Sequence, residues 1–100
     1  MGVRFMRKNQ ILRGKADEAI AFAGDIAAHW EETYGTKLTW GFEIGGDVGT
    51  LYWFADHASL ANLESEMMAS MDNEATNKLL GEAADLFDGA PKDKIIVTMN

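Results

Sequence analysis

A chain of 100 residues with 47% hydrophobic and 25% charged residues has the composition of an ordinary folded protein, and we assign residues 1–100 to one domain. It contains no cysteine, which excludes disulfides and thiolate chemistry. The net charge is −7, and residues 16–100 hold 4 basic and 16 acidic groups, a balance of −12 that opposes nucleic-acid binding. No apolar run is long enough to span a bilayer, and residues 1–10 lack the apolar core of a secretory signal. We therefore expect a cytoplasmic protein without a membrane partner.

Hydrophobic periodicity predicts the elements of the first half of the chain. Residues 3–12 alternate as a strand, and residues 16–34 follow the three- and four-residue period of a helix that Gly35 would end as a left-handed cap. Residues 37–44 alternate again. The glycine-rich stretch 45–49 then predicts a turn into a third strand, 49–57, which makes a β-hairpin.

The second half predicts a helix in two pieces and a last strand. Asp56 or Ser59 can cap the first piece. Its expected buried stripe is Leu60, Leu63, Met67 and Met71. An interruption at 72–73 leads to a second piece that runs through Phe87 and ends before residues 89–91, and residues 94–99 form a strand.

The resulting order, β-α-β-β-α-β with a split second helix, predicts an α+β, ferredoxin-like antiparallel sheet with both helices on one face. In the third strand, LYWFADH, both faces are apolar. If Leu51 and Trp53 face the helices, Tyr52 and Phe54 lie on the open face, where exposure to water forgoes about 1.5–3 kcal/mol for each ring. A second copy of the chain, packed sheet against sheet into a barrel, would cover them. A monomer with an exposed aromatic patch is the alternative.

The segments LYWFADHASLANLE and MDNEATNKLL resemble the aromatic third strand, the following helix start and the acidic break of the dimeric α+β barrel superfamily. These features resemble those of its NIPSNAP-like and stress-responsive branches. The resemblance covers almost the whole chain, and it implies a homodimer. The superfamily includes antibiotic-biosynthesis monooxygenases, haem-degrading monooxygenases, isomerases and members without known activity, so the fold alone does not fix the chemistry.

The same resemblance implies candidate catalytic residues. The monooxygenase branches pair an Asn on the first strand with a Trp on the third, which here are Asn9 and Trp53, and the haem degraders add an axial His on the second helix, which here is His57. His57 follows Trp53 by only four residues, so it falls at the strand exit and not well inside a helix. We therefore expect no cofactor, with haem as the less favoured alternative.

The basic first strand indicates a ligand site. Arg7 and Asn9 share one face, and Arg4, Lys8 and Gln10 share the other. Charged residues on a central strand are unusual unless they are paired or line a cavity. A small anionic, carbonyl-bearing or aromatic ligand would find donors there beside aromatic walls, for which the candidates are Trp40, Tyr52 and Phe54.

The remaining polar residues give weaker signals. His29 and His57 are the only histidines, without metal-ligand spacing, so no metal site is predicted. We expect His29 to pair with Asp25, one helical turn earlier. Glu43 or Asp56 could act as a general base only if buried. Two functions stay open: a small-molecule-binding protein of unknown activity, or a cofactor-independent monooxygenase or isomerase.

Overall fold

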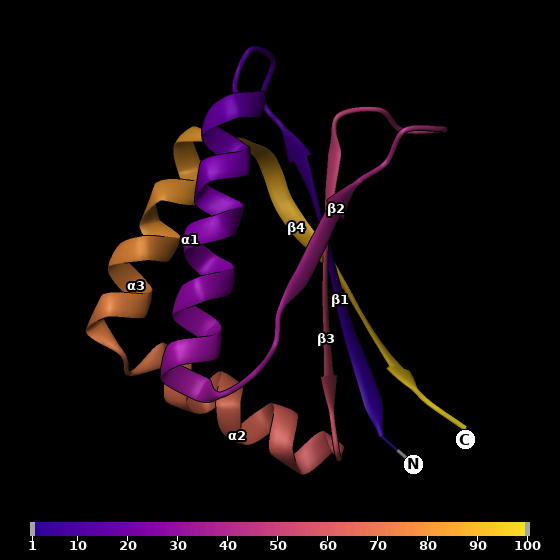
Figure 1. The fold of residues 1–100 in the computed structure, drawn as a ribbon, viewed down its shortest axis with the longest axis vertical. Coiled ribbons are helices and arrows are strands. Elements are labelled where there is room, and N and C mark those ends of the chain that lie inside the picture. Colours follow the sequence, from indigo (N-terminus) through magenta and orange to yellow (C-terminus); the bar gives the residue numbers. More distant parts are fainter. Residues whose placement is uncertain (1, 100) are drawn as a thin grey trace.

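The computed structural model describes residues 2–99 as a four-stranded antiparallel sheet with the helices on one face (Figure 1). The strands are β1 (Val3–Ile11), β2 (Thr39–Phe42), β3 (Thr50–His57) and β4 (Phe87–Val97), in the spatial order β2-β3-β1-β4. The helices are α1 (Ala16–Tyr34), α2 (Leu60–Met71) and α3 (Glu74–Leu80), and a short 3-10 helix spans Gly81–Asp85. This confirms the ferredoxin-like α+β fold and the split second helix.

Helix α1 forms where the sequence predicts it and supplies most of the helical side of the core. Its buried residues are Ala19, Phe22, Ala23 and Ile26. Gly35 ends the helix with φ 69° and donates its N–H to the carbonyl of Glu31 at 3.0 Å. Glycine adopts this left-handed conformation without the steric cost that a β-carbon would bring.

Strand β3 divides its side chains between two environments, as predicted. Leu51, Trp53 and Ala55 are buried on the side of the helices. Tyr52 and Phe54 lie half-buried on the opposite, open face, where their rings stack with centroids 6.2 Å apart and planes at 9°. The two faces differ because successive side chains of a strand point in opposite directions.

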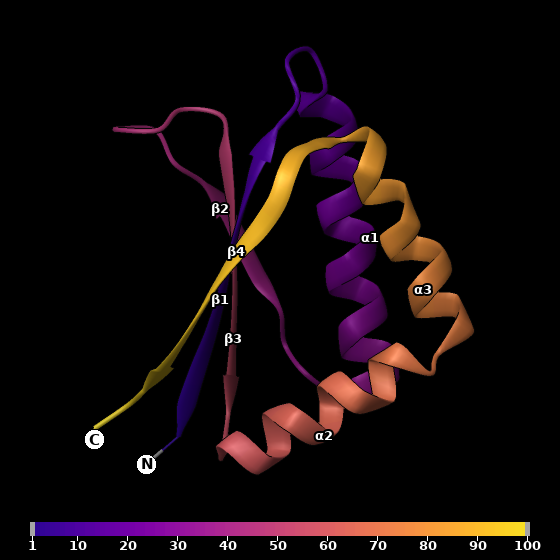
Figure 2. The ribbon, with the colours of Figure 1, turned by 180° about the vertical axis from the view of Figure 1, so that it is seen from behind.

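Helix α2 departs from the prediction. The Ser59 hydroxyl caps it by accepting the N–H of Asn62 at 3.1 Å. Of the predicted buried stripe, however, only Leu63 is buried, and Leu60, Met67 and Met71 are exposed. Figures 1 and 2 show the reason: α2 runs across one end of the helical layer, whereas α1 and α3 lie along the sheet.

Strand β4 begins earlier than predicted. Phe87 is its first residue and not the end of a helix, and residues 89–91, predicted as a stop, lie within the strand. The register against β1 shifts between Lys8 and Gln10, which marks a bulge. An edge strand tolerates the missing N–H of Pro91 at such an irregularity, and Gly89 takes a positive φ of 72°.

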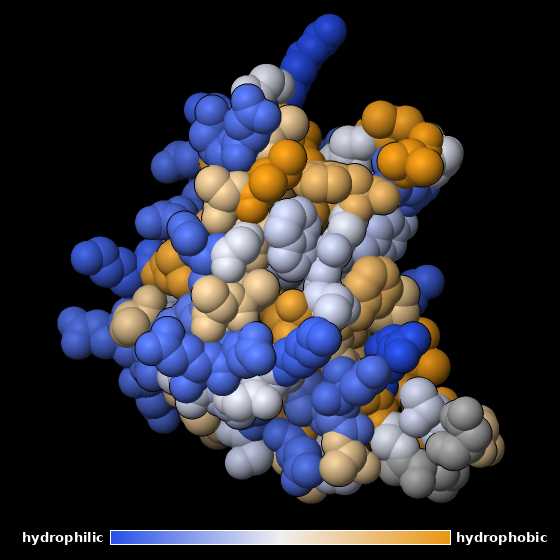
Figure 3. All heavy atoms as spheres, viewed as in Figure 1, coloured by the Kyte–Doolittle hydropathy of each residue, from blue (hydrophilic) through white to orange (hydrophobic). Residues whose placement is uncertain are grey.

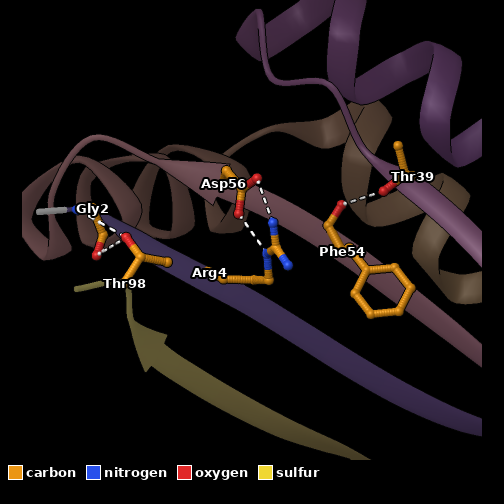
Figure 4. Close-up of polar contacts among 6 residues, drawn as sticks. All are labelled: Gly2, Arg4, Thr39, Phe54, Asp56 and Thr98. Carbon is orange, nitrogen blue, oxygen red and sulfur yellow. Dashed lines mark hydrogen bonds and ion pairs between the residues drawn. The ribbon is translucent and has the colours of Figure 1, made fainter. Parts of the chain in front are cut away.

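The two ends of the described chain meet at the sheet. The Gly2 N–H donates to Thr98 Oγ1 at 3.1 Å, and Arg4 makes a two-point ion pair with Asp56 on the open face (Figure 4). Hydrophilic side chains cover the helices, whereas apolar ones gather at the projecting tip between β2 and β3 (Figure 3), where Ile44 is 93% exposed. No helix in residues 2–99 is long and apolar enough to cross a membrane.

Candidate ligand cavity

A cavity of about 540 Å³ lies between the helix-facing side of the sheet and the helices. This volume falls within the range of about 300–1,000 Å³ that is usual for small-molecule sites. Its walls are mainly apolar and aromatic, and they include Phe5, Phe22, Trp53, Met67 and Met71. Met67 and Met71 of α2 are exposed because they border this space and not a packed core. Methionine side chains can adapt to ligands of different shape.

Asn9 and Trp53 form the polar centre of the cavity wall. The indole Nε1 of Trp53 donates to Oδ1 of Asn9 at 2.8 Å, and both residues are buried. Because an indole N–H can only donate, the amide oxygen must face it, and this fixes the orientation of the Asn9 amide. Within residues 2–99 the Asn9 amide nitrogen has no hydrogen-bond partner. The wall therefore offers a fixed N–H donor to a bound molecule.

Arg7 lines the same cavity but is already paired. Its Nε and one terminal nitrogen donate to the two carboxylate oxygens of Asp93 on β4, at 2.8 and 2.9 Å. Its guanidinium also lies 5.5 Å from the centre of the Phe5 ring. The two-point pairing fixes the position of the guanidinium and neutralises its charge.

A hydrogen-bonded cluster is centred on Glu66 of α2, and its partners come from α1, from the segment after α1 and from the end of β3. The carboxylate of Glu66 accepts the indole N–H of Trp30 at 3.2 Å and the hydroxyl of Thr36, and it lies 3.1 Å from Nε2 of His57. The side chains of His57 and Glu66 are only 6% and 13% exposed. With an ionised carboxylate as partner, Nε2 of His57 carries the proton and donates. Nδ1 is buried without a partner within the described chain.

His57 and Glu66 also border a second hollow. This hollow, of about 440 Å³, is more open and is lined mostly by polar residues, including Tyr34, Asp56 and Asn62; we call it the polar cleft. The same two residues therefore border both the apolar cavity and the polar cleft.

Several solved structures share this architecture. A NIPSNAP family protein from Agrobacterium tumefaciens superimposes with a TM-score of 0.86 at 14% sequence identity, covering 99% of this chain and 87% of that chain. A NIPSNAP-like domain protein from Burkholderia xenovorans gives a TM-score of 0.83 at 10% identity, over 98% of this chain and 85% of that one. SnoaB, a cofactor-independent oxygenase from Streptomyces nogalater, gives 0.74 at 12% identity, over 99% and 94% of the two chains.

The chain therefore shares the fold of these proteins. The expected resemblance to the dimeric α+β barrel superfamily is thereby confirmed at the level of the fold. Sequence identities this low show a shared fold and do not show a shared function. No family model and no curated protein matches the sequence.

The fold brings four of the predicted site residues together. Asn9, Trp53, His57 and Arg7 all line the cavity. The predicted ligand-contacting aromatics do not join them: Tyr52 and Phe54 lie on the open face, and Trp40 packs against the core on β2. The sheet separates Tyr52 and Phe54 from this cavity, whereas Trp40 lies on the helix-facing side, paired with Trp53, but does not line the cavity.

The cavity does not fit haem through His57. His57 is the last residue of β3, Nε2 is engaged by Glu66, and Nδ1 is buried. An axial ligand needs a nitrogen lone pair directed at the iron. No cluster of three potential metal ligands occurs within residues 2–99.

Other predicted polar roles change as well. His29 bonds Thr76 Oγ1 through Nε2 at 2.6 Å, and so the predicted pairing with Asp25 is wrong. The hydrogen bond from Tyr52 lowers the pKa of Glu43, and the one from Arg4 lowers the pKa of Asp56. Neither carboxyl has the raised pKa that a buried general base would show.

Proposed function

We propose that the cavity binds a small aromatic molecule that carries a carbonyl group, and that the amide of Asn9 donates a hydrogen bond to this carbonyl. The hydrogen bond between Trp53 and Asn9 is the observation that carries the proposal. It leaves a fixed amide donor in an apolar space, which is the arrangement that orients a ligand by one polar contact. A carbonyl oxygen is the complementary acceptor.

The charges of the cavity favour a neutral ligand over an anionic one. Arg7 is neutralised by its ion pair with Asp93. The acidic side chain of the lining, Glu66, accepts hydrogen bonds from Trp30 and Thr36. An anion would therefore meet no uncompensated cation, and an apolar site raises the cost of an unpaired charge. The anionic ligand stays as the alternative, which requires Arg7 to leave Asp93.

Turnover of such a ligand is the second candidate function, and the fold shared with SnoaB favours it. In a cofactor-independent monooxygenase or isomerase, removal of a proton next to the carbonyl places negative charge on the carbonyl oxygen. A preorganised N–H donor at that position stabilises the developing charge. In this reading Asn9 takes this role, with Trp53 holding its amide.

We also propose that two copies pack through their open faces. The stacked rings of Tyr52 and Phe54 give this face an apolar centre. Acidic groups such as Glu43 and Asp56 balance its basic groups, Arg4 and Lys8 among them, so the face can meet its own copy without strong repulsion. The ligand cavity lies on the other side of the sheet, so each copy would keep its own site.

Binding can be tested with a neutral fluorescent aromatic, N-phenyl-1-naphthylamine, by titration into the purified protein. We expect saturable fluorescence enhancement. Ala55→Phe fills the cavity from β3, and we expect it to weaken the affinity for the probe at least fivefold. Met71→Trp fills the cavity from the exposed side of α2, and it replaces Ala55→Phe in the test if that variant does not fold. Ala21→Phe, at an exposed position of α1, is the matched control. Equal binding by all four proteins would contradict the proposal.

A further inference from the structure

We propose that Met67 and Met71 form an oxidation site at the opening of the ligand cavity, where a hydroperoxide converts their thioethers to sulfoxides and weakens ligand binding. The inference rests on the proposed function, because its consequence is a change in the affinity of the cavity for an apolar ligand. It assigns a role to two methionines that the sequence predicts as core residues and that border the cavity instead.

The cavity opens between α2 and the first part of β4. Its exposed lining residues mark the side from which solvent and ligands reach it, and they are Met67, Met71, Ala84, Gly89 and Pro91. The other lining residues are buried or half-buried. A ligand that enters by this opening therefore passes the side chains of Met67 and Met71.

The two methionines are accessible because the packing of α2 does not enclose them. They are 43% and 68% exposed, and they lie one helical turn apart on the same side of the helix. Leu63 is the buried residue of α2, so the methionines do not serve as its core contact. An oxidant in solution can thus reach both side chains without unfolding the helix.

The oxidation balances with a hydroperoxide as the one co-reactant, here hydrogen peroxide. A lone pair on the thioether sulfur attacks one peroxide oxygen, the O–O bond breaks, and a sulfur–oxygen bond forms. The sulfur loses two electrons, and the peroxide is reduced. The proton of the transferred hydroxyl passes to the departing hydroxide, which leaves as water. Because a thioether carries no ionisable proton, the step needs no neighbouring base.

The sulfoxides change the chemistry of the opening. Each one replaces a flexible apolar side chain by a polar one. Water can hydrate a sulfoxide oxygen while the cavity is empty, but an apolar ligand at the opening displaces that water and supplies no hydrogen bond in return. We therefore expect oxidation of both methionines to weaken the affinity for an apolar ligand about fivefold.

Met68 provides the matched control. It follows Met67 in the same helix and is 65% exposed, but it does not line the cavity. Met68→Leu thus removes an accessible thioether away from the opening, and this variant should lose affinity on oxidation as the wild type does. The double variant Met67→Leu/Met71→Leu has no thioether at the opening, and its affinity should be the same before and after oxidation.

The test exposes the folded protein to hydrogen peroxide, removes the excess with catalase, and titrates N-phenyl-1-naphthylamine. The affinity of each protein after treatment is compared with its own affinity before treatment. Peptide mass spectrometry should locate one added oxygen on Met67 and one on Met71. The two methionine sulfoxide reductases, one for each sulfoxide epimer, should then restore the affinity of the treated wild type. This last step tests the site without any substitution, should the double variant not fold.

The outcomes separate this inference from the proposed function. If the wild type keeps its affinity with both methionines oxidised, or if both resist oxidation, the oxidation site is wrong and the binding site stands. Equal losses in the wild type and the double variant, no recovery with the reductases, or unfolding of the treated protein by circular dichroism also overturn it. If the probe does not bind before any treatment, the proposed function itself fails.

Discussion

The indole of Trp53 reaches diagonally across two neighbouring strands to the amide of Asn9, with 2.8 Å between Nε1 and Oδ1. In the strand register Asn9 lies opposite Leu51, and Trp53 lies opposite Arg7, so the contact joins diagonal neighbours on one face of the sheet. The register therefore determines both the orientation of the amide and the donor that the cavity presents.

Removal of the Asn9 side chain should destabilise the protein. In Asn9→Ala the indole N–H of Trp53 loses its acceptor in a buried position, and we expect a loss of about 1–3 kcal/mol in the free energy of unfolding. Urea denaturation measures it, with Lys8→Ala on the open face as the control. In a double-mutant cycle with Trp53→Phe, the two losses should not add. Full additivity would mean that the hydrogen bond contributes nothing.

Loss of the Glu66 carboxylate should loosen α2. Only one residue of this helix is buried, so its position depends on the bonds from Glu66 to Trp30, Thr36 and His57. Glu66→Ala leaves these donors unpaired, and we expect a cost of about 2–3 kcal/mol. Glu64→Ala should change stability by less than about 0.5 kcal/mol. Similar stabilities for the two variants in urea denaturation would show that the cluster does not anchor the helix.

Stability should fall with acid through two carboxyls of the open face. Hydrogen bonds from Tyr52 and Arg4 hold the folded-state pKa values of Glu43 and Asp56 below their ordinary values of 4.5 and 3.8. Their contributions are therefore complete above those ordinary values and are lost as the pH falls through the lowered ones. Tyr52→Phe removes the bond to Glu43, and denaturation midpoints from pH 7 to pH 2 should then fall less steeply. An unchanged profile would contradict this assignment.

A charge on the open face should separate the proposed dimer. Phe54→Arg places a cation beside its own copy at the twofold contact, and the species of twice the 11.0 kDa chain mass should give way to the single chain. Native mass spectrometry reads this directly. Ile20→Arg, an exposed apolar position on α1, is the control and should stay dimeric. If the wild-type protein is monomeric, the proposed dimer is wrong, and Tyr52 and Phe54 form a contact surface for a different partner.

Much of the fold could be predicted from local patterns. The period of residues 16–34 and the left-handed Gly35 predicted α1 to the residue, and the alternation in β3 predicted which aromatics face the helices. These features depend on short-range periodicity, which the sequence displays directly.

The remaining features depend on tertiary placement. The apolar spacing of α2 predicted a buried stripe, but this helix lies across the end of the layer, so Met67 and Met71 border a cavity. Phe87 fits a helical period and yet starts β4, because pairing with Ile11 adds it to the sheet. Glu66 gave no signal, since its partners Trp30 and Thr36 are at least thirty positions away in the chain.

The most direct test of the proposed site compares 2-acetylnaphthalene with 2-ethylnaphthalene, which have nearly the same shape and differ in the carbonyl oxygen. Isothermal titration calorimetry should show about fivefold tighter binding of the ketone, since one additional hydrogen bond contributes about 1 kcal/mol. Asn9→Leu should remove this preference, and Trp53→Phe, which keeps the amide, should retain part of it. Equal affinities of the wild-type protein for the two compounds would contradict the assignment of Asn9 as the carbonyl donor.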